Sequence, residues 1–170
     1  MKKRILFVVA QRDWRDEELL VPQALLTKRG GMVTITSTIA GPIVGKGGTE
    51  AIATVAVAEA SIRNYDAIVF VGGSGSAEYF DDPVALKLAS ECYHGGKVTA
   101  AICAATSILA NAGVLMGKQC TGYYDQEQNI INHGGDYTGL SVEVDGSVVT
   151  GRDAAAAAEF AERIAYLLEL

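Results

Sequence analysis

Short runs of apolar and β-branched residues recur along the chain. They cover residues 3–10, 32–38, 67–71 and 97–102. Continuous runs of this length are typical of strands that a parallel sheet buries on both faces. Segments with apolar residues at helical spacing lie between or after them: residues 17–28, 84–93 and 154–168. The alternation predicts an α/β three-layer fold with a mainly parallel sheet, in a single domain that spans residues 1–170.

Two further segments have the composition of hairpins. Residues 40–58 are rich in Gly, Ala, Val and Thr and are interrupted by glycine-containing turns. This segment predicts a strand excursion or hairpin at the edge of the sheet. Residues 141–149 alternate around an Asp-Gly turn and predict a second hairpin. Shorter elements are expected elsewhere, namely helices over residues 58–64, 104–112 and 125–132 and a strand over residues 119–123.

The composition limits the class of protein. With 170 residues, of which 49% are hydrophobic and 20% charged, the chain can bury a core and lacks the signature of disorder. The net charge is −6 and the basic cluster is confined to residues 2–4, so we expect no nucleic-acid partner. The apolar run after that cluster is too short for a signal peptide. No run of about 18 apolar residues follows, so we expect no membrane partner.

Three cysteines, Cys92, Cys103 and Cys120, are odd in number and lack C-x-x-C spacing. They indicate a reducing, cytoplasmic location rather than a disulfide framework, and we expect no metal site. Cys92 and Cys120 lie at positions where packing residues are expected. Cys103 differs from both, because a predicted strand ends at it and a predicted helix follows directly.

A side chain at such a sharp turn from strand to helix projects above the edge of the sheet. Ala101 and Ala105, two positions on either side of Cys103, are small enough to permit the turn. Free N–H groups and the positive end of the following helix favour the thiolate over the thiol. Cys103 is therefore a candidate nucleophile. The alternative is a buried cysteine that packs as a small apolar residue.

Two other predicted strands, which end at Ala10 and Val71, have their carboxyl ends at the same edge of the parallel sheet as Cys103. The loop after Ala10 leads to Glu18, whose carboxyl could hydrogen-bond the sulfur, in its protonated form if it is desolvated. The alternative is an acid that stabilises the helix N-terminus, and spacing does not separate Glu18 from Asp16 and Glu17. The pair Gly72–Gly73 could place the N–H of Gly73 beside that of Ala104 as an oxyanion site, or form an ordinary turn.

The two histidines and Arg152 each allow a structural and a functional interpretation. His94 and His133 lie near helix ends followed by glycine pairs, where an imidazolium has a structural role; either one could instead return to Cys103 as a base. Tyr123 is a candidate for the pocket lining, together with His133 and Gly72. Arg152 could bind an anion or form a surface salt bridge.

Several short motifs occur in a specific order. They are ELLVP at residues 18–22, VGG at 71–73, AAICA at 100–104, TGY at 121–123, INHGG at 131–135, DG at 145–146 and VTGR at 149–152. Together they resemble the DJ-1/PfpI (ThiJ) superfamily over essentially the whole chain. The resemblance implies a flavodoxin-like sandwich with Cys103 as nucleophile, Glu18 as its carboxyl partner, and the N–H groups of Gly73 and Ala104 at the oxyanion position. It also implies a homodimer or a larger assembly built from dimers.

One departure bears on function. PfpI-type proteases carry a histidine directly after the nucleophile, whereas Ala104 stands there in this chain. We therefore expect an enzyme of the glyoxalase III or deglycase type, which acts on small carbonyl compounds through Cys103 and Glu18 without a metal or other cofactor. An intracellular cysteine peptidase or amidase with a non-adjacent histidine is an alternative. A redox-sensing or chaperone-like stress protein, in which Cys103 is oxidised, is another.

Overall fold

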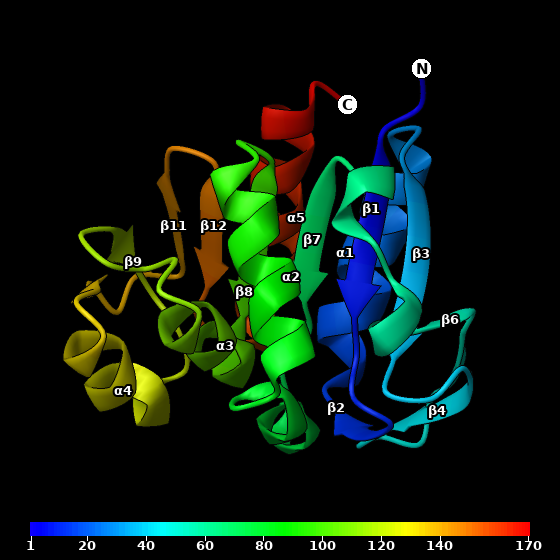
Figure 1. The fold of residues 1–170 in the computed structure, drawn as a ribbon, viewed down its shortest axis with the longest axis horizontal. Helices are drawn as coiled ribbons and strands as arrows, with labels where there is room; N and C mark the ends of the chain where they lie inside the picture. Colours follow the sequence, from blue (N-terminus) through cyan, green and yellow to red (C-terminus); the bar gives the residue numbers. More distant parts are fainter.

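The computed structural model describes all 170 residues and is built around a seven-stranded sheet (Figure 1). In sheet order the strands are β11 (Val142–Asp145), β12 (Val148–Gly151), β8 (Val98–Ile102), β7 (Ala67–Phe70), β1 (Arg4–Val8), β3 (Met32–Ser37) and β6 (Val55–Ala56). All neighbours are parallel except β11 and β12, which form the predicted second hairpin. The central order β3-β1-β7-β8-β12 is that of a flavodoxin-like sheet, as expected.

Helices cover both faces of this sheet, which gives the predicted three layers (Figure 1). One face carries α1 (Asp16–Lys28) and α5 (Ala157–Leu168), and the other carries α2 (Pro83–His94) and α3 (Thr106–Asn111). Successive residues of β1 alternate between the two cores: Leu6 packs with the α2–α3 side and Phe7 with the α1–α5 side. This alternation explains why the strand is apolar at nearly every position. None of the helices has the length and apolar character needed to cross a membrane.

The hairpin predicted within residues 40–58 is confirmed, but it belongs to a separate small sheet, and only the last strand of this segment lies at the edge of the main sheet. β4 (Gly41–Gly45) and β5 (Glu50–Ala53) are antiparallel, and β4 pairs with β2 (Arg12–Trp14) in a separate three-stranded sheet. Of this region, the short β6 pairs with the main sheet. Asp16 fixes the position of the hairpin turn: its carboxylate accepts the N–H groups of Gly47 and Thr49 at 3.0 and 3.2 Å, and the Thr49 hydroxyl at 2.5 Å.

Smaller elements differ from expectation in their details. The short helix expected over residues 58–64 consists of two 3₁₀ turns, Val57–Glu59 and Ile62–Asn64. β9 (Gln119–Cys120) pairs with β10 (Asp136–Tyr137), a strand that the sequence pattern does not predict. The expected helix near residues 125–132 is a 3₁₀ turn followed by α4 (Glu127–Asn132). Cys92 and Cys120 are fully buried, as expected for packing residues.

Candidate active site

The carboxyl ends of β1, β7 and β8 meet at one edge of the sheet, where the strand order reverses around β1 (Figure 1). Open α/β sheets bind their ligands at such an edge. A cavity of about 420 Å³ opens there, and its lining includes Glu18 from α1, Gly73 after β7, and Cys103 and Ala104 after β8. Tyr123 lines the same cavity. Five residues predicted from separate parts of the sequence therefore come together.

Cys103 adopts the strained backbone of a nucleophile elbow. Its φ angle is +60°, a left-handed conformation that is uncommon for residues other than glycine and costs about 1–3 kcal/mol. Two hydrogen bonds hold this conformation, because the Cys103 carbonyl accepts the N–H of Tyr123 at 3.2 Å and the hydroxyl of Thr106 at 2.9 Å. The half-buried side chain of Cys103 lines the cavity, as the predicted turn requires.

Gly72 and Gly73 let the neighbouring strand end approach this elbow closely. A Cβ atom on Gly72 would lie 2.6 Å from the carbonyl oxygen of Ile102 and 2.8 Å from Cβ of Cys103, so only glycine fits. Gly73 has a φ angle of +101°, which also favours glycine. Gly72 does not line the cavity; its carbonyl instead accepts the N–H of Arg15 at 3.0 Å and joins the two loops.

The carboxyl of Glu18 is fully buried at the base of the cavity. Neither of its oxygens makes a hydrogen bond of ordinary geometry, and the polar groups that act on it most are the Cys103 thiol and the N–H of Gly72. Burial raises the pKa of Glu18 to about 7, against the lowering effect of these two groups. The structure thus separates the three acids: Asp16 binds the hairpin turn, and Glu17 is an exposed partner of Arg15.

The surroundings of the Cys103 thiol act against the predicted thiolate. Burial raises its pKa, and the nearby Glu18 carboxylate raises it further, whereas the N–H groups of Ala104 and Gly73 lower it. The following helix, α3, does little to stabilise a thiolate, because it has six residues and begins only after a 3₁₀ turn. The pair is therefore a thiol beside a carboxyl group whose pKa lies near neutrality. Such a carboxylate is suited to act as a general base.

Neither histidine is near this pair. At the end of α2, Nδ1 of His94 lies 2.8 Å from the carbonyl oxygen of Ser90, and at the end of α4, Nδ1 of His133 lies 2.8 Å from that of Asn129. Neither residue lines the cavity, so the prediction of His133 as a pocket residue is wrong. Each ring bonds the carbonyl four residues earlier in its own helix. No group of three or more His, Cys, Asp or Glu side chains gathers in a metal-binding arrangement.

The cavity also contains residues that the sequence did not single out for it. Arg15, Lys46 and Ser74 lie in its lining, as do Asp125 and Asp153. Arg15 precedes Glu18 by three residues, which is the one local signal that pointed to it. Nothing in the sequence connected Lys46 with Cys103, because the contact depends on where the hairpin packs.

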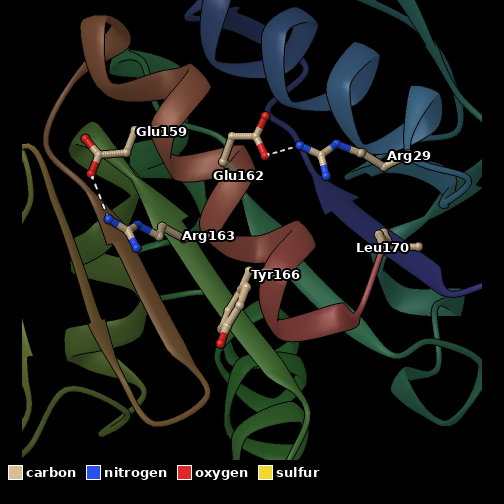
Figure 2. Close-up of a pocket in the computed structure, with 6 residues that line it drawn as sticks. All are labelled: Arg29, Glu159, Glu162, Arg163, Tyr166 and Leu170. Carbon is tan, nitrogen blue, oxygen red and sulfur yellow. Dashed lines mark hydrogen bonds and ion pairs between the residues drawn. The ribbon is translucent and has the colours of Figure 1, made fainter.

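A second cavity, of about 370 Å³, lies along α5, with Arg29 from just beyond the end of α1 in its lining (Figure 2). Two ion pairs occupy its walls, with Arg29 and Glu162 joined at 2.6 Å and Arg163 and Glu159 at 3.5 Å. Tyr166 and Leu170 complete the lining. Its charged groups are paired with one another and it contains no nucleophile, so it is not a candidate active site.

Comparison with known proteins agrees with the fold and with the motifs. A sequence profile of the DJ-1/PfpI family matches residues 3–167. The chain is 37% identical to an uncharacterized protein of Methanocaldococcus jannaschii over 152 residues, 88% of this chain and 74% of that protein. It is 33% identical to Deglycase PfpI of Pyrococcus furiosus over 149 residues, 88% and 89% of the two chains. The crystal structure of a ThiJ/PfpI domain protein from Brachyspira murdochii superposes with a TM-score of 0.96 at 26% identity, covering 99% of this chain and 98% of the other. The chain therefore belongs to the DJ-1/PfpI family.

Proposed function

We propose that this protein is a cysteine-dependent enzyme of small reactive carbonyl compounds, of the glyoxalase III or deglycase type. The observation that carries the proposal is the buried Glu18 carboxyl beside the Cys103 thiol in a small cavity. The N–H groups of Gly73 and Ala104 act on the same sulfur. The name of the Pyrococcus furiosus relative, a deglycase, supports the same class of substrate.

In the proposed first step, Sγ of Cys103 adds to the aldehyde carbon of the substrate. A C–S bond forms, and the π electrons of the carbonyl move to its oxygen. Glu18 takes the thiol proton, a role that suits a carboxyl group with a pKa of about 7. The N–H groups of Gly73 and Ala104 would stabilise the developing oxyanion until Glu18 returns the proton to it, which leaves Glu18 ionised again. The product of this step is a hemithioacetal.

With methylglyoxal as substrate, Glu18 would then move one proton. Removal of the hydrogen from the former aldehyde carbon gives an enediolate, and protonation of the neighbouring carbon converts this into a thioester of Cys103. Hydrolysis of the thioester releases lactate and restores the thiol. The net reaction adds one water molecule to methylglyoxal, so the steps need neither an oxidant nor a reductant.

The two alternative functions have weaker support. A peptidase needs a group that protonates the leaving amine, and neither histidine of this chain lines the cavity. A redox-sensing role would rest on a thiol with a lowered pKa, whereas burial and Glu18 raise the pKa of Cys103. The geometry favours attack on a substrate that enters beside Glu18.

The proposal is tested by following lactate formation from methylglyoxal without glutathione, in a buffer that contains no amine. We expect turnover by the wild-type protein, and a loss of about a thousandfold or more in Cys103→Ser, because the C–S bond is the first step. Cys92→Ala is the matched control, since Cys92 is buried far from the cavity lining and should leave turnover intact. Equal rates for wild type and Cys103→Ser would disprove the proposed function.

A further inference from the structure

We propose that the cavity selects carbonyl substrates that carry a carboxylate, which Arg15 and Lys46 hold at its mouth. This inference rests on the proposed function of Cys103 and names the substrate class more closely. A 2-oxoaldehyde with a terminal carboxylate is the simplest member of that class.

Arg15 is fixed to the same frame as the nucleophile. Its backbone N–H donates to the carbonyl of Gly72 at 3.0 Å, and its own carbonyl accepts the N–H of Glu18 at 3.1 Å. The side chain lines the cavity, and its Nε donates to Glu17 at 3.0 Å. The two terminal nitrogens of the guanidinium have no partner within the protein. One edge of the planar fork is thus free to bind a carboxylate.

Lys46 reaches the cavity from a different part of the fold. It lies in the turn between β4 and β5, and its backbone N–H donates to the carbonyl of Trp14 at 2.8 Å. Asp16 binds the next residues of the turn, Gly47 and Thr49, so the backbone under Lys46 is held on both sides. Lys46 is exposed, its ammonium group makes no hydrogen bond and no ion pair within the protein, and the residue lines the cavity together with Arg15. Two cationic side chains from separate elements therefore line one opening.

Besides Glu18, the acids of the cavity are Asp125 and Asp153, which come from other elements than the two cations. Asp153 follows β12, whereas Arg15 follows β2; β8 and β7, which lead to Cys103 and Gly73, stand between β12 and β1 in the sheet. The charge of Asp153 is paired with Arg152 at 2.9 Å, which confirms the salt-bridge reading of that arginine. Asp125 makes no ion pair and accepts a hydrogen bond from Gln126. An anionic tail is thus repelled by Asp125 and attracted toward Arg15 and Lys46, with the reacting carbonyl between them.

The charged side chains at the mouth can bind a monoanion. Arg15 is paired with Glu17, and the carboxylate of Asp16 is occupied by hydrogen bonds from the hairpin turn, so Lys46 is the cation here without a charged partner. A single carboxylate could pair with Lys46 and with the free edge of the Arg15 guanidinium.

The first test compares two alkylating agents of nearly equal size, anionic iodoacetate and neutral iodoacetamide. The measured quantity is the ratio of their rates at Cys103, determined by peptide mass mapping and divided by the same ratio for the urea-unfolded protein. We expect Arg15→Gln and Lys46→Gln each to lower this ratio about fivefold, the effect of one screened charge at close range. Sodium chloride should reduce the wild-type ratio as well. Lys28→Gln is the control, because Lys28 is exposed at the end of α1 and does not line the cavity.

The second test uses two substrates of equal carbon number, 4,5-dioxopentanoate and the neutral 2-oxopentanal. We expect kcat/KM to favour the carboxylate in the wild type, and this preference to fall by about fivefold in each cation variant but not in Lys28→Gln. Turnover of both substrates without a preference for the carboxylate would overturn this inference and leave the proposed function standing. If neither substrate is turned over while methylglyoxal is, the inference fails and the proposed function stands; if methylglyoxal is not turned over either, both fail. An alkylation ratio that is equal in wild type, Arg15→Gln and Lys46→Gln would disprove the inference.

Discussion

Cys103 and Glu18 form a pair whose properties come from each other and from burial. In water, the thiol would have the pKa of an ordinary cysteine, and the carboxyl group would have a pKa well below 7. Together, and with the carboxyl fully buried, both groups hold their protons more tightly. Addition to a carbonyl exchanges the S–H bond for an S–C bond, so no thiolate is left in the cavity, and the proton passes to the ionised form of Glu18. The chemistry thus depends on a coupled pair rather than on a preformed thiolate.

The buried acid has a measurable effect on stability. Burial raises the pKa of Glu18 from its ordinary value of 4.5 to about 7 in the folded state. The folded protein therefore binds this proton more tightly than the unfolded chain, and its contribution to stability is lost as the pH rises from about 4.5 to 7. Glu18→Gln stays neutral and removes this loss. We expect the variant to be more stable than wild type at pH 8, by up to about 3 kcal/mol, with little difference near pH 4.5.

Urea unfolding of both proteins at acidic and alkaline pH measures this effect. Glu17→Gln is the matched control, because Glu17 is an exposed acid in the preceding position and should show no comparable dependence on pH. A difference between Glu18→Gln and wild type that is the same at both pH values would contradict the raised pKa.

At the scale of elements, the site depends on how the small sheet is attached to the large one. β2 follows β1 and pairs with β4, and the start of α1 binds the turn that follows β4. Burial acts to raise the pKa of Asp16, but hydrogen bonds from Thr49 and Gly47 outweigh it and lower the pKa below its ordinary value. The ionised carboxylate thus joins the hairpin to the helix that carries Glu18. Its contribution is present at neutral pH and is lost as the pH falls and the carboxylate is protonated.

Removing this carboxylate should release the hairpin turn. In Asp16→Ala, the amides of Gly47 and Thr49 lose their acceptor, so we expect their hydrogen exchange to become at least about tenfold faster, as for the loss of roughly 1.4 kcal/mol of local protection. Glu17→Ala, in the next position of the same helix, should leave these amides unchanged. Exchange measured by mass spectrometry or NMR decides this. Unchanged protection in Asp16→Ala would show that β2 alone holds the turn.

At the scale of the whole molecule, one face of α1 exposes apolar side chains that pack into neither core. On α1, Leu20 is 41% and Val21 is 37% exposed, and together with Ala24 and Leu25 they line a shallow depression on the surface. Exposed apolar side chains that gather on one helix face are typical of surfaces that bind another protein. The motifs of the sequence also imply a homodimer or a larger assembly.

We therefore predict that the protein self-associates through this face of α1. Light scattering after size-exclusion chromatography should give the mass of a dimer or a larger assembly for the wild type, and a smaller mass for Leu20→Glu. Met116→Glu is the control, because Met116 is an exposed apolar residue outside α1. A monomeric wild type would refute the prediction, and a Leu20→Glu variant with the wild-type mass would assign the contact to another surface.

Much of the fold was predictable, because burial leaves regular patterns in a sequence. β1, β7 and β8 are apolar at nearly every position since both faces of each strand are covered, and this predicts a parallel sheet between helices. The β4–β5 hairpin was also predictable as a local structure. Its attachment to β2 was not, because that pairing joins segments about thirty residues apart and depends on Asp16, whose side chain resembles any other acid of a first helical turn.

The sequence by itself determined the strand-to-helix turn at Cys103, the glycines that approach it, and a carboxyl after the first strand as its candidate partner. These features depend on local backbone geometry and on residue size, which short motifs record directly. The tertiary structure alone decided that His133 does not line the cavity, that Arg15 and Lys46 share it, and that burial and Glu18 raise the pKa of the Cys103 thiol. Those outcomes depend on desolvation and on contacts between distant segments, and both exist only once the chain has folded.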